Sequence, residues 1–115
     1  MPPFSRSPQE LVARFDAFTA RLDGVEHRKM FGYPALFVGG NLATGLHEAS
    51  WMVRLGADDL ASLLALPGAR PFEPMPGRPM KGYAVLPVAV IDDDAALDAW
   101  VGRAIAFTRG LPPKR

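Results

Sequence analysis

The sequence predicts an α+β domain of two layers, in which one mainly antiparallel sheet carries helices on one face. Apolar stripes of helical period lie near both ends of the chain, and the region between them has short apolar segments separated by turn residues. Strands that cluster along the chain, apart from the helices, are typical of α+β folds. The expected order is one helix, four strands, one helix, one strand and one helix. The length suits a single domain, residues 1–115, with short tails at residues 1–6 and 111–115.

The first helix is predicted to begin at Ser7-Pro8-Gln9-Glu10, which is a capping box with proline at the first helical position. Gly24 is expected to end it. Between these signals the apolar residues repeat at spacings of four, three and four, which is one face of a helix: Leu11, Phe15, Phe18 and Leu22.

Four antiparallel strands are predicted between Val25 and Leu55, over residues 26–30, 35–38, 42–47 and 50–55. Gly39-Gly40-Asn41 indicates a tight hairpin, because glycine and asparagine tolerate a positive φ. Alternation along a strand places every second side chain on the same face. The residues expected to share a face are Leu42, Thr44 and Leu46 in the third strand, and Trp51, Val53 and Leu55 in the fourth.

The second half of the sequence predicts two more helices, one before and one after a last strand over residues 82–86. Asp58 is expected to cap the first of these helices, and Pro67-Gly68 to stop it. The aspartates at residues 92–94 supply a cap and favourable negative charge for the final helix, which Gly110 ends. The apolar stripe of that helix is Leu97, Trp100, Val101, Ala104 and Ile105.

Between these elements, residues 70–86 are rich in proline, which excludes a helix and a central strand. The segment is no flexible linker, because it contains four apolar anchors: Phe72, Met75, Met80 and Tyr83. It also carries Arg78 and Lys81. A stiff, anchored loop with two cations is a candidate recognition surface, and Arg28-Lys29 forms a second basic pair upstream.

The residue types give no sign of catalysis. Without cysteine the chain has no disulfide, thiol nucleophile or cysteine zinc site. His47 and Glu48 are neighbours that point to opposite faces of a strand, and the aspartates at residues 92–94 lack the spacing of a calcium loop. No serine lies in a Gly-x-Ser-x-Gly motif. We therefore expect no catalytic residue, no metal site and no cofactor.

Charge and hydropathy limit the class of partner. The net charge of +1 predicts weak, unselective binding to DNA at most, because a domain that neutralises many phosphates is usually far more basic. No apolar run approaches the roughly 20 residues of a membrane helix. The first residues lack the apolar segment of a signal peptide, so a cytoplasmic location is expected.

The candidate interaction surface consists of four cations and one aromatic residue. Cations around an apolar patch can meet an acidic protein, nucleic acid or an anionic ligand. The alternative is that these are solvated charges on edge segments whose apolar neighbours belong to the core. The residues are Arg28, Lys29, Arg78, Lys81 and Tyr83.

Several motifs together resemble the N-terminal domain of the TfoX/Sxy family. They are the segments at residues 28–33, 36–41, 51–55 and 72–83, followed by Leu86-Pro87, Leu97, Trp100 and residues 111–114. The resemblance implies a two-layer fold similar to secretion-chaperone-like domains. It also implies a link to regulators of natural competence, whose full-length members carry a second domain and assist a cyclic-AMP-responsive activator at promoters. The family supplies no catalytic residue to carry over.

The function predicted is therefore a non-enzymatic regulatory or interaction module, a stand-alone domain of the TfoX N-terminal type. It is expected to act in transcriptional regulation through an unidentified partner protein, with a transcription factor as one candidate, and a homodimer is left open. The alternative is a small-ligand-binding protein or weak enzyme with a pocket beside the proline-rich loop. A deep, closed pocket with converging polar groups would favour that alternative.

Overall fold

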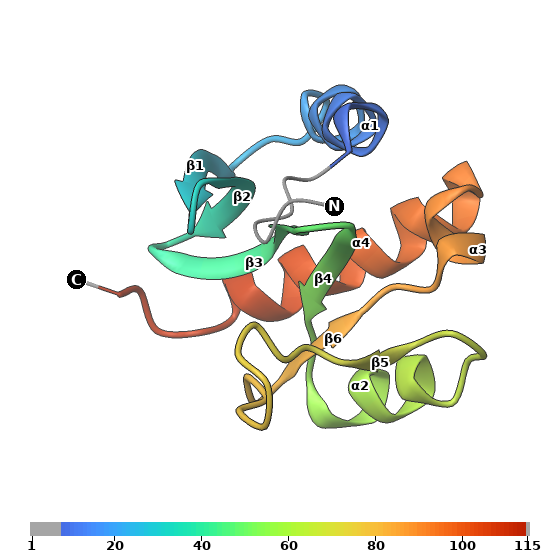
Figure 1. Cartoon of the computed structure of the whole chain (residues 1–115). Helices are drawn as coiled ribbons and strands as arrows, with labels where there is room; N and C mark the ends of the chain where they lie inside the picture. The colour runs from blue at the N-terminus through green and yellow to red at the C-terminus, as the bar shows by residue number, and fades with distance from the viewer. Residues whose placement is uncertain (1–7, 115) are drawn as a thin grey trace.

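The computed structural model describes residues 8–114 and contains one six-stranded sheet with four helices (Figure 1). All strand pairs are antiparallel, in the order β1-β2-β3-β4-β6-β5 across the sheet. This arrangement confirms the predicted α+β class and the order of the main elements. The elements are α1 (Gln9–Thr19), β1 (Glu26–Met30), β2 (Tyr33–Val38), β3 (Asn41–His47), β4 (Ser50–Arg54), α2 (Ala57–Leu64), β5 (Arg70–Pro71), β6 (Tyr83–Val85), α3 (Val88–Ile91) and α4 (Asp94–Arg109).

The helices cover one face of the sheet, as predicted. All four contribute buried side chains to one apolar cluster, which also contains residues of β2, β3, β4 and β6. In Figure 1, α4 runs behind β3 and β4, and it packs against both strands. The predicted stripe of α4 lies in this cluster except for Trp100, which is half-buried beneath the guanidinium of Arg103 at 4.6 Å.

The opposite face of the sheet is also covered, and its cover is the proline-rich segment between β5 and β6. A second apolar cluster lies there, to which no helix contributes. Phe72 is fully buried in it, and Met80 packs against its margin. The strand residues of this cluster are Ala35, Leu42, Met52, Tyr83 and Val85. The loop therefore uses its apolar anchors to complete the fold.

Trp51 lies at the centre of the helix-side cluster and is fully buried. Its ring centre is 4.9 Å from that of Phe15 and 6.2 Å from that of Phe18, so two residues of α1 pack on it. Its indole Nε1 donates a hydrogen bond of 2.9 Å to the hydroxyl of Thr44, which in turn donates to the carbonyl of Met52 at 2.7 Å. The buried polar atoms of this centre are thus satisfied, as a dry core requires.

A β-bulge in β3 corrects one prediction about the faces. Leu36 pairs with Thr44 while Phe37 pairs with Leu42, so Ala43 is an extra residue in β3. An extra residue shifts the alternation by one position. Thr44 therefore faces the helices, whereas Leu42, predicted on the same face, belongs to the second cluster. In β4, where the register is regular, Trp51 and Val53 share the helix side as expected.

The first helix is shorter than predicted. It ends at Thr19, whose hydroxyl donates to the carbonyl of Phe15 at 2.7 Å, and not at Gly24. Leu22 lies beyond the end of the helix but still packs against the core, so the apolar repeat of the sequence extends further than the helix itself. Pro8 occupies the N-cap without a side-chain bond, and Ser7 lies outside the described residues.

Caps and short elements differ in part from expectation. Asp93 caps α4 as predicted, because its carboxylate accepts from the amides of Ala95 and Ala96. Gly56 is the N-cap of α2, so the prediction that Asp58 caps it is wrong; Asp58 lies in the first turn, where its charge still suits the helix dipole. The short elements β5 and α3 have no sequence signal.

None of the helices within residues 8–114 is long and apolar enough to cross a membrane.

The predicted hairpin at residues 39–40 joins β2 to β3, and both glycines have a positive φ. The C-terminal segment lies against this turn. The amide of Lys114 donates to the carbonyl of Gly39 at 2.7 Å, and Asn41 donates to the carbonyl of Pro112 at 3.0 Å. A Cβ on Gly40 would lie 2.7 Å from the carbonyl oxygen of Lys114, so only glycine fits there.

Replacing Trp51 by alanine should lower the free energy of unfolding by about 3–5 kcal/mol, because a large cavity would form between α1 and the sheet. Trp100→Ala is the matched control and should have a clearly smaller effect, since Trp100 is half-buried. Urea unfolding followed by far-UV circular dichroism measures both. A loss for Trp51→Ala that is well below this range and no larger than that for Trp100→Ala would contradict the dependence of α1 and the sheet on Trp51.

Candidate interaction surface

The tip of the hairpin between β1 and β2 exposes an aromatic side chain on a strained backbone. The turn consists of Phe31 and Gly32 alone, with φ values of 55° and 83°. Positive φ at both positions is the geometry of a tight hairpin turn, which asparagine, aspartate or glycine usually supplies. Phenylalanine in this region costs on the order of 1–2 kcal/mol. Its side chain is nevertheless 67% exposed, so burial does not compensate for the strain.

An aromatic cluster behind the tip holds the ring of Phe31 in place. His47, at the end of β3, lies edge-on to Phe31 with ring centres 6.3 Å apart. The same imidazole is 5.2 Å from the ring of Tyr33 and 5.4 Å from that of Phe72, a buried residue of the proline-rich segment. The hairpin tip is therefore anchored to the second face of the sheet through His47.

Arg28 and Lys29 lie beside this tip, on opposite faces of β1. Arg28 pairs across the hairpin with Ala35; its guanidinium lies 5.1 Å from the ring centre of Phe37 and donates to Glu26 at 2.9 Å. Lys29 pairs with Pro34 and makes no ion pair with any described residue. The two predicted cations therefore present charge on both sides of one edge of the sheet.

Lys29 lines a groove of about 520 Å³ between α1 and the hairpin. Its apolar lining comes from both elements, with Val12 and Phe15 from α1 and Pro34 from β2. Its ionisable lining residues are Asp16, His27, Arg28 and Lys29. Such a groove can hold apolar side chains of a ligand while Lys29 meets a negative charge. We call Phe31, Arg28, Lys29 and this groove the hairpin surface.

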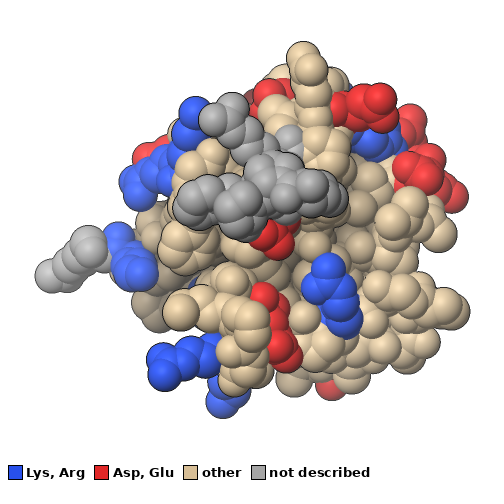
Figure 2. Space-filling view, in the orientation of Figure 1, with Lys and Arg blue, Asp and Glu red and all other residues tan. Residues whose placement is uncertain are grey.

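Arg78 and Lys81 lie elsewhere, in the segment between β5 and β6, and both are exposed. A turn orders this segment: the amide of Arg78 donates to the carbonyl of Met75 at 2.9 Å, and the amide of Gly77 to the carboxylate of Glu73 at 3.2 Å. Strands β2, β3 and β4 separate β1 from β6. Figure 2 accordingly shows separate groups of Lys and Arg over β1, over the C-terminal segment and over this loop.

Tyr83, the fifth predicted residue, is only 8% exposed. Its hydroxyl donates to the carbonyl of Leu42 at 3.1 Å and accepts a long bond of 3.5 Å from Arg54, whose guanidinium also lies 5.4 Å from the tyrosine ring centre. Burial raises the pKa of Tyr83 above its ordinary value of 10.0, while the charge of Arg54 acts in the opposite direction. Tyr83 thus joins β6 to β3 and Arg54.

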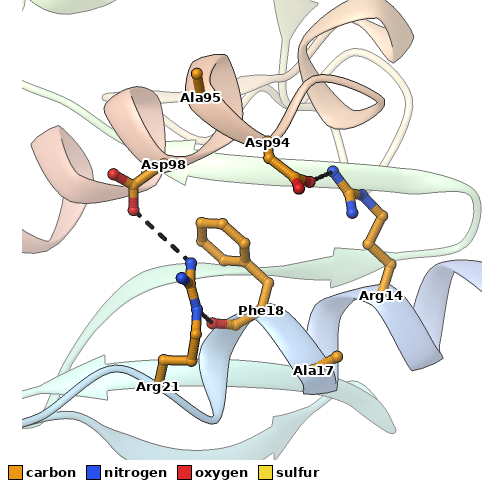
Figure 3. Close-up of a pocket in the computed structure, with 7 residues that line it drawn as sticks. All are labelled: Arg14, Ala17, Phe18, Arg21, Asp94, Ala95 and Asp98. Carbon is orange, nitrogen blue, oxygen red and sulfur yellow. Dashed lines mark hydrogen bonds and ion pairs between the residues drawn. The ribbon is translucent and has the colours of Figure 1, made fainter.

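A second groove, between α1 and α4, is lined by two arginines and two aspartates (Figure 3). Arg14 donates to Asp94 and to the carbonyl of Ile91, both at 2.7 Å. Arg21 approaches Asp98 at 4.0 Å across the ring of Phe18. Because each cation already faces a carboxylate, the groove connects two helices and offers little free charge to a ligand.

Two residues, Phe31 at the hairpin tip and His47 behind it, are absent from the set of predicted interaction residues. Phe31 has a signal in the sequence, since a two-residue turn of Phe-Gly between two strands places a bulky residue where asparagine or aspartate is usual. His47 has none, because its role depends on Tyr33 and Phe72 meeting across the sheet. Within residues 8–114, no three His, Asp or Glu side chains lie close enough together to hold a metal ion.

The fold and this surface define a small α+β domain with exposed apolar and basic side chains on a hairpin at the edge of its sheet. The sequence matches the family model of the TfoX N-terminal domain over residues 17–108, and the chain belongs to that family. No curated protein and no solved structure matches the chain.

Tyr83→Phe should lower the free energy of unfolding by about 1 kcal/mol at neutral pH, because the bond to the Leu42 carbonyl is lost. The raised folded-state pKa adds a pH dependence. The stabilisation of the folded state by neutral, buried Tyr83 is fully present below the unfolded-state pKa and is lost as the pH rises through the folded-state pKa. The wild-type protein should therefore lose stability relative to the variant as the pH rises above about 10, the unfolded-state pKa of tyrosine. Urea midpoints that stay parallel over this range would contradict the burial of Tyr83.

Arg78→Ala combined with Lys81→Ala should change the free energy of unfolding by no more than about 0.5 kcal/mol, as exposed substitutions usually do. The backbone bonds that order the loop involve neither side chain. Thermal or urea unfolding of the double variant measures this. A larger loss would show that the two cations stabilise the loop.

Proposed function

We propose that this protein is a non-enzymatic regulatory module that works by binding a partner protein through the hairpin surface. The family assignment supports a regulatory or interaction role. The observation that carries the choice of surface is Phe31, a strained residue that leaves its ring exposed. Strain that is kept without a packing gain is typical of binding and switch sites.

The composition of the hairpin surface supports a protein as the partner. The surface exposes both an aromatic residue and an arginine, and these residue types are enriched at protein interfaces. The chain carries a net charge of only +1, and its exposed cations lie in separate groups, which disfavours direct binding to nucleic acid. The partner we propose is a transcription factor in the cytoplasm, in line with the competence regulators that the family resemblance implies. Arg78 and Lys81 stay a second candidate surface.

The test is a substitution that separates binding from folding. Phe31→Asn should leave the free energy of unfolding unchanged or raise it by up to about 1 kcal/mol, because asparagine adopts a positive φ far more readily. The same variant should lose most of the partner protein that the wild-type chain captures from nuclease-treated native lysate. Capture quantified by mass spectrometry and unfolding in urea give the two readouts.

Val88→Asn is the matched control, because Val88 is an equally exposed apolar residue, 70% accessible, in α3. The Val88→Asn variant should capture as much partner protein as the wild-type chain. Equal capture by both variants and the wild-type chain would contradict a binding role for the hairpin. If only the Arg78→Ala, Lys81→Ala variant fails to capture the partner protein, the binding surface is the proline-rich loop and not the hairpin. Recovery of nucleic acid, with capture abolished by nuclease, would contradict a protein partner.

A further inference from the structure

We propose that the partner binds by adding an extended, acidic segment to the free edge of β1 as a further strand of the sheet. This inference rests on the proposed function and specifies the chemistry of the partner. It depends on three features of the hairpin: an edge that no described strand pairs with, a groove that receives side chains, and a cation without an ion pair to any described residue.

Within residues 8–114, the outer edge of β1 is open along the whole strand. Strand β1 is the first in the sheet order and pairs only with β2 among the described strands. Residues 26–29 are all exposed, and no described element covers them. An open edge presents a row of backbone donors and acceptors that a further strand can pair with.

The register shows which backbone groups are available. In a hairpin with a two-residue turn, the closing pair, here Met30 and Tyr33, exchanges hydrogen bonds, and bonded pairs then alternate along the ladder. Arg28 is thus bonded to β2, whereas the amides and carbonyls of His27 and Lys29 point away from it. Neither residue makes a backbone hydrogen bond outside the hairpin to any described residue.

The same two residues line the groove against α1. A strand that pairs with His27 and Lys29 would place alternate side chains over this groove, where Val12, Phe15 and Pro34 provide apolar contacts. Side chains would thereby add selectivity to the affinity that the main chain supplies. Phe31 lies at the end of the edge, where it can contact the residue that follows the added strand.

The charge of the edge favours an acidic side chain opposite Lys29, whereas Asp16 across the groove and Glu26 in β1 disfavour negative charge next to them. Arg28 is already paired with Glu26, but Lys29 has no ion pair with a described residue. A second copy of β1 is disfavoured in two registers, because a two-fold pairing centred on Arg28 or on Lys29 places the same cation opposite itself. The register centred on His27 lacks this conflict, so the experiment includes a test for self-association.

The probe is the synthetic seven-residue peptide Thr-Val-Thr-Glu-Thr-Val-Thr, whose valines and central glutamate share one face, compared with the same peptide carrying lysine for glutamate. Hydrogen exchange of the intact protein is followed by NMR. The glutamate peptide should protect the amides of His27 and Lys29 and leave that of Arg28 unchanged, since it is already bonded to β2. The lysine peptide should give no such protection.

Lys29 also allows a matched pair of variants. Lys29→Ala removes the charge and keeps the amide, and it should weaken peptide binding by about two- to threefold. Lys29→Pro removes the amide donor as well, which edge strands tolerate, and should weaken binding by about a further fivefold. If the proline variant does not fold, the wild-type exchange pattern still decides.

Three results would overturn the proposal: no protection at His27 and Lys29, equal protection by both peptides, or equal binding by the alanine and proline variants. Protection that rises with protein concentration in the absence of peptide, together with a dimer in sedimentation, would identify a second copy as the occupant instead. If Phe31→Asn abolishes partner capture while the amides stay unprotected, the proposed function stands and only the strand addition fails.

Discussion

The packing of Trp51 against α1 is the contact on which the other layers of the structure depend. The indole fills the space beneath Phe15 and Phe18, and its Nε1 is satisfied by Thr44 on the neighbouring strand. The contact therefore joins the first helix, β3 and β4 at one point. Because the bulge at Ala43 turns Thr44 toward the helices, the hydrogen bond and the register of β3 depend on each other.

Both faces of the sheet are buried, although helices cover only one of them. On the other face, the proline-rich segment supplies Phe72 and Met80 as cover, and Tyr83 fixes the start of β6 to the carbonyl of Leu42. Prolines reduce the conformational freedom that such a long segment would lose on folding. The segment therefore stabilises the sheet while its charged side chains stay in solvent.

Two features of the hairpin of β1 and β2 do not serve stability. Phe31 adopts an unfavourable backbone conformation and exposes its ring, and Lys29 has no ion pair with a described residue. His47 holds the tip against Phe72, so the strained turn is positioned by the same segment that covers the second face. This coupling places the surface proposed for binding on a rigid base.

The sequence by itself determined the helices of strong period, the tight turns and the α+β order, because these depend on neighbours within a few residues: the stripe of α4, the cap at Asp93 and the glycines at 39 and 40. Tertiary structure alone decided the bulge that reverses Leu42, the burial of Tyr83 and the separation of Arg28 and Lys29 from Arg78 and Lys81. Each of these follows from strand register and from contacts between distant segments, which local patterns do not encode.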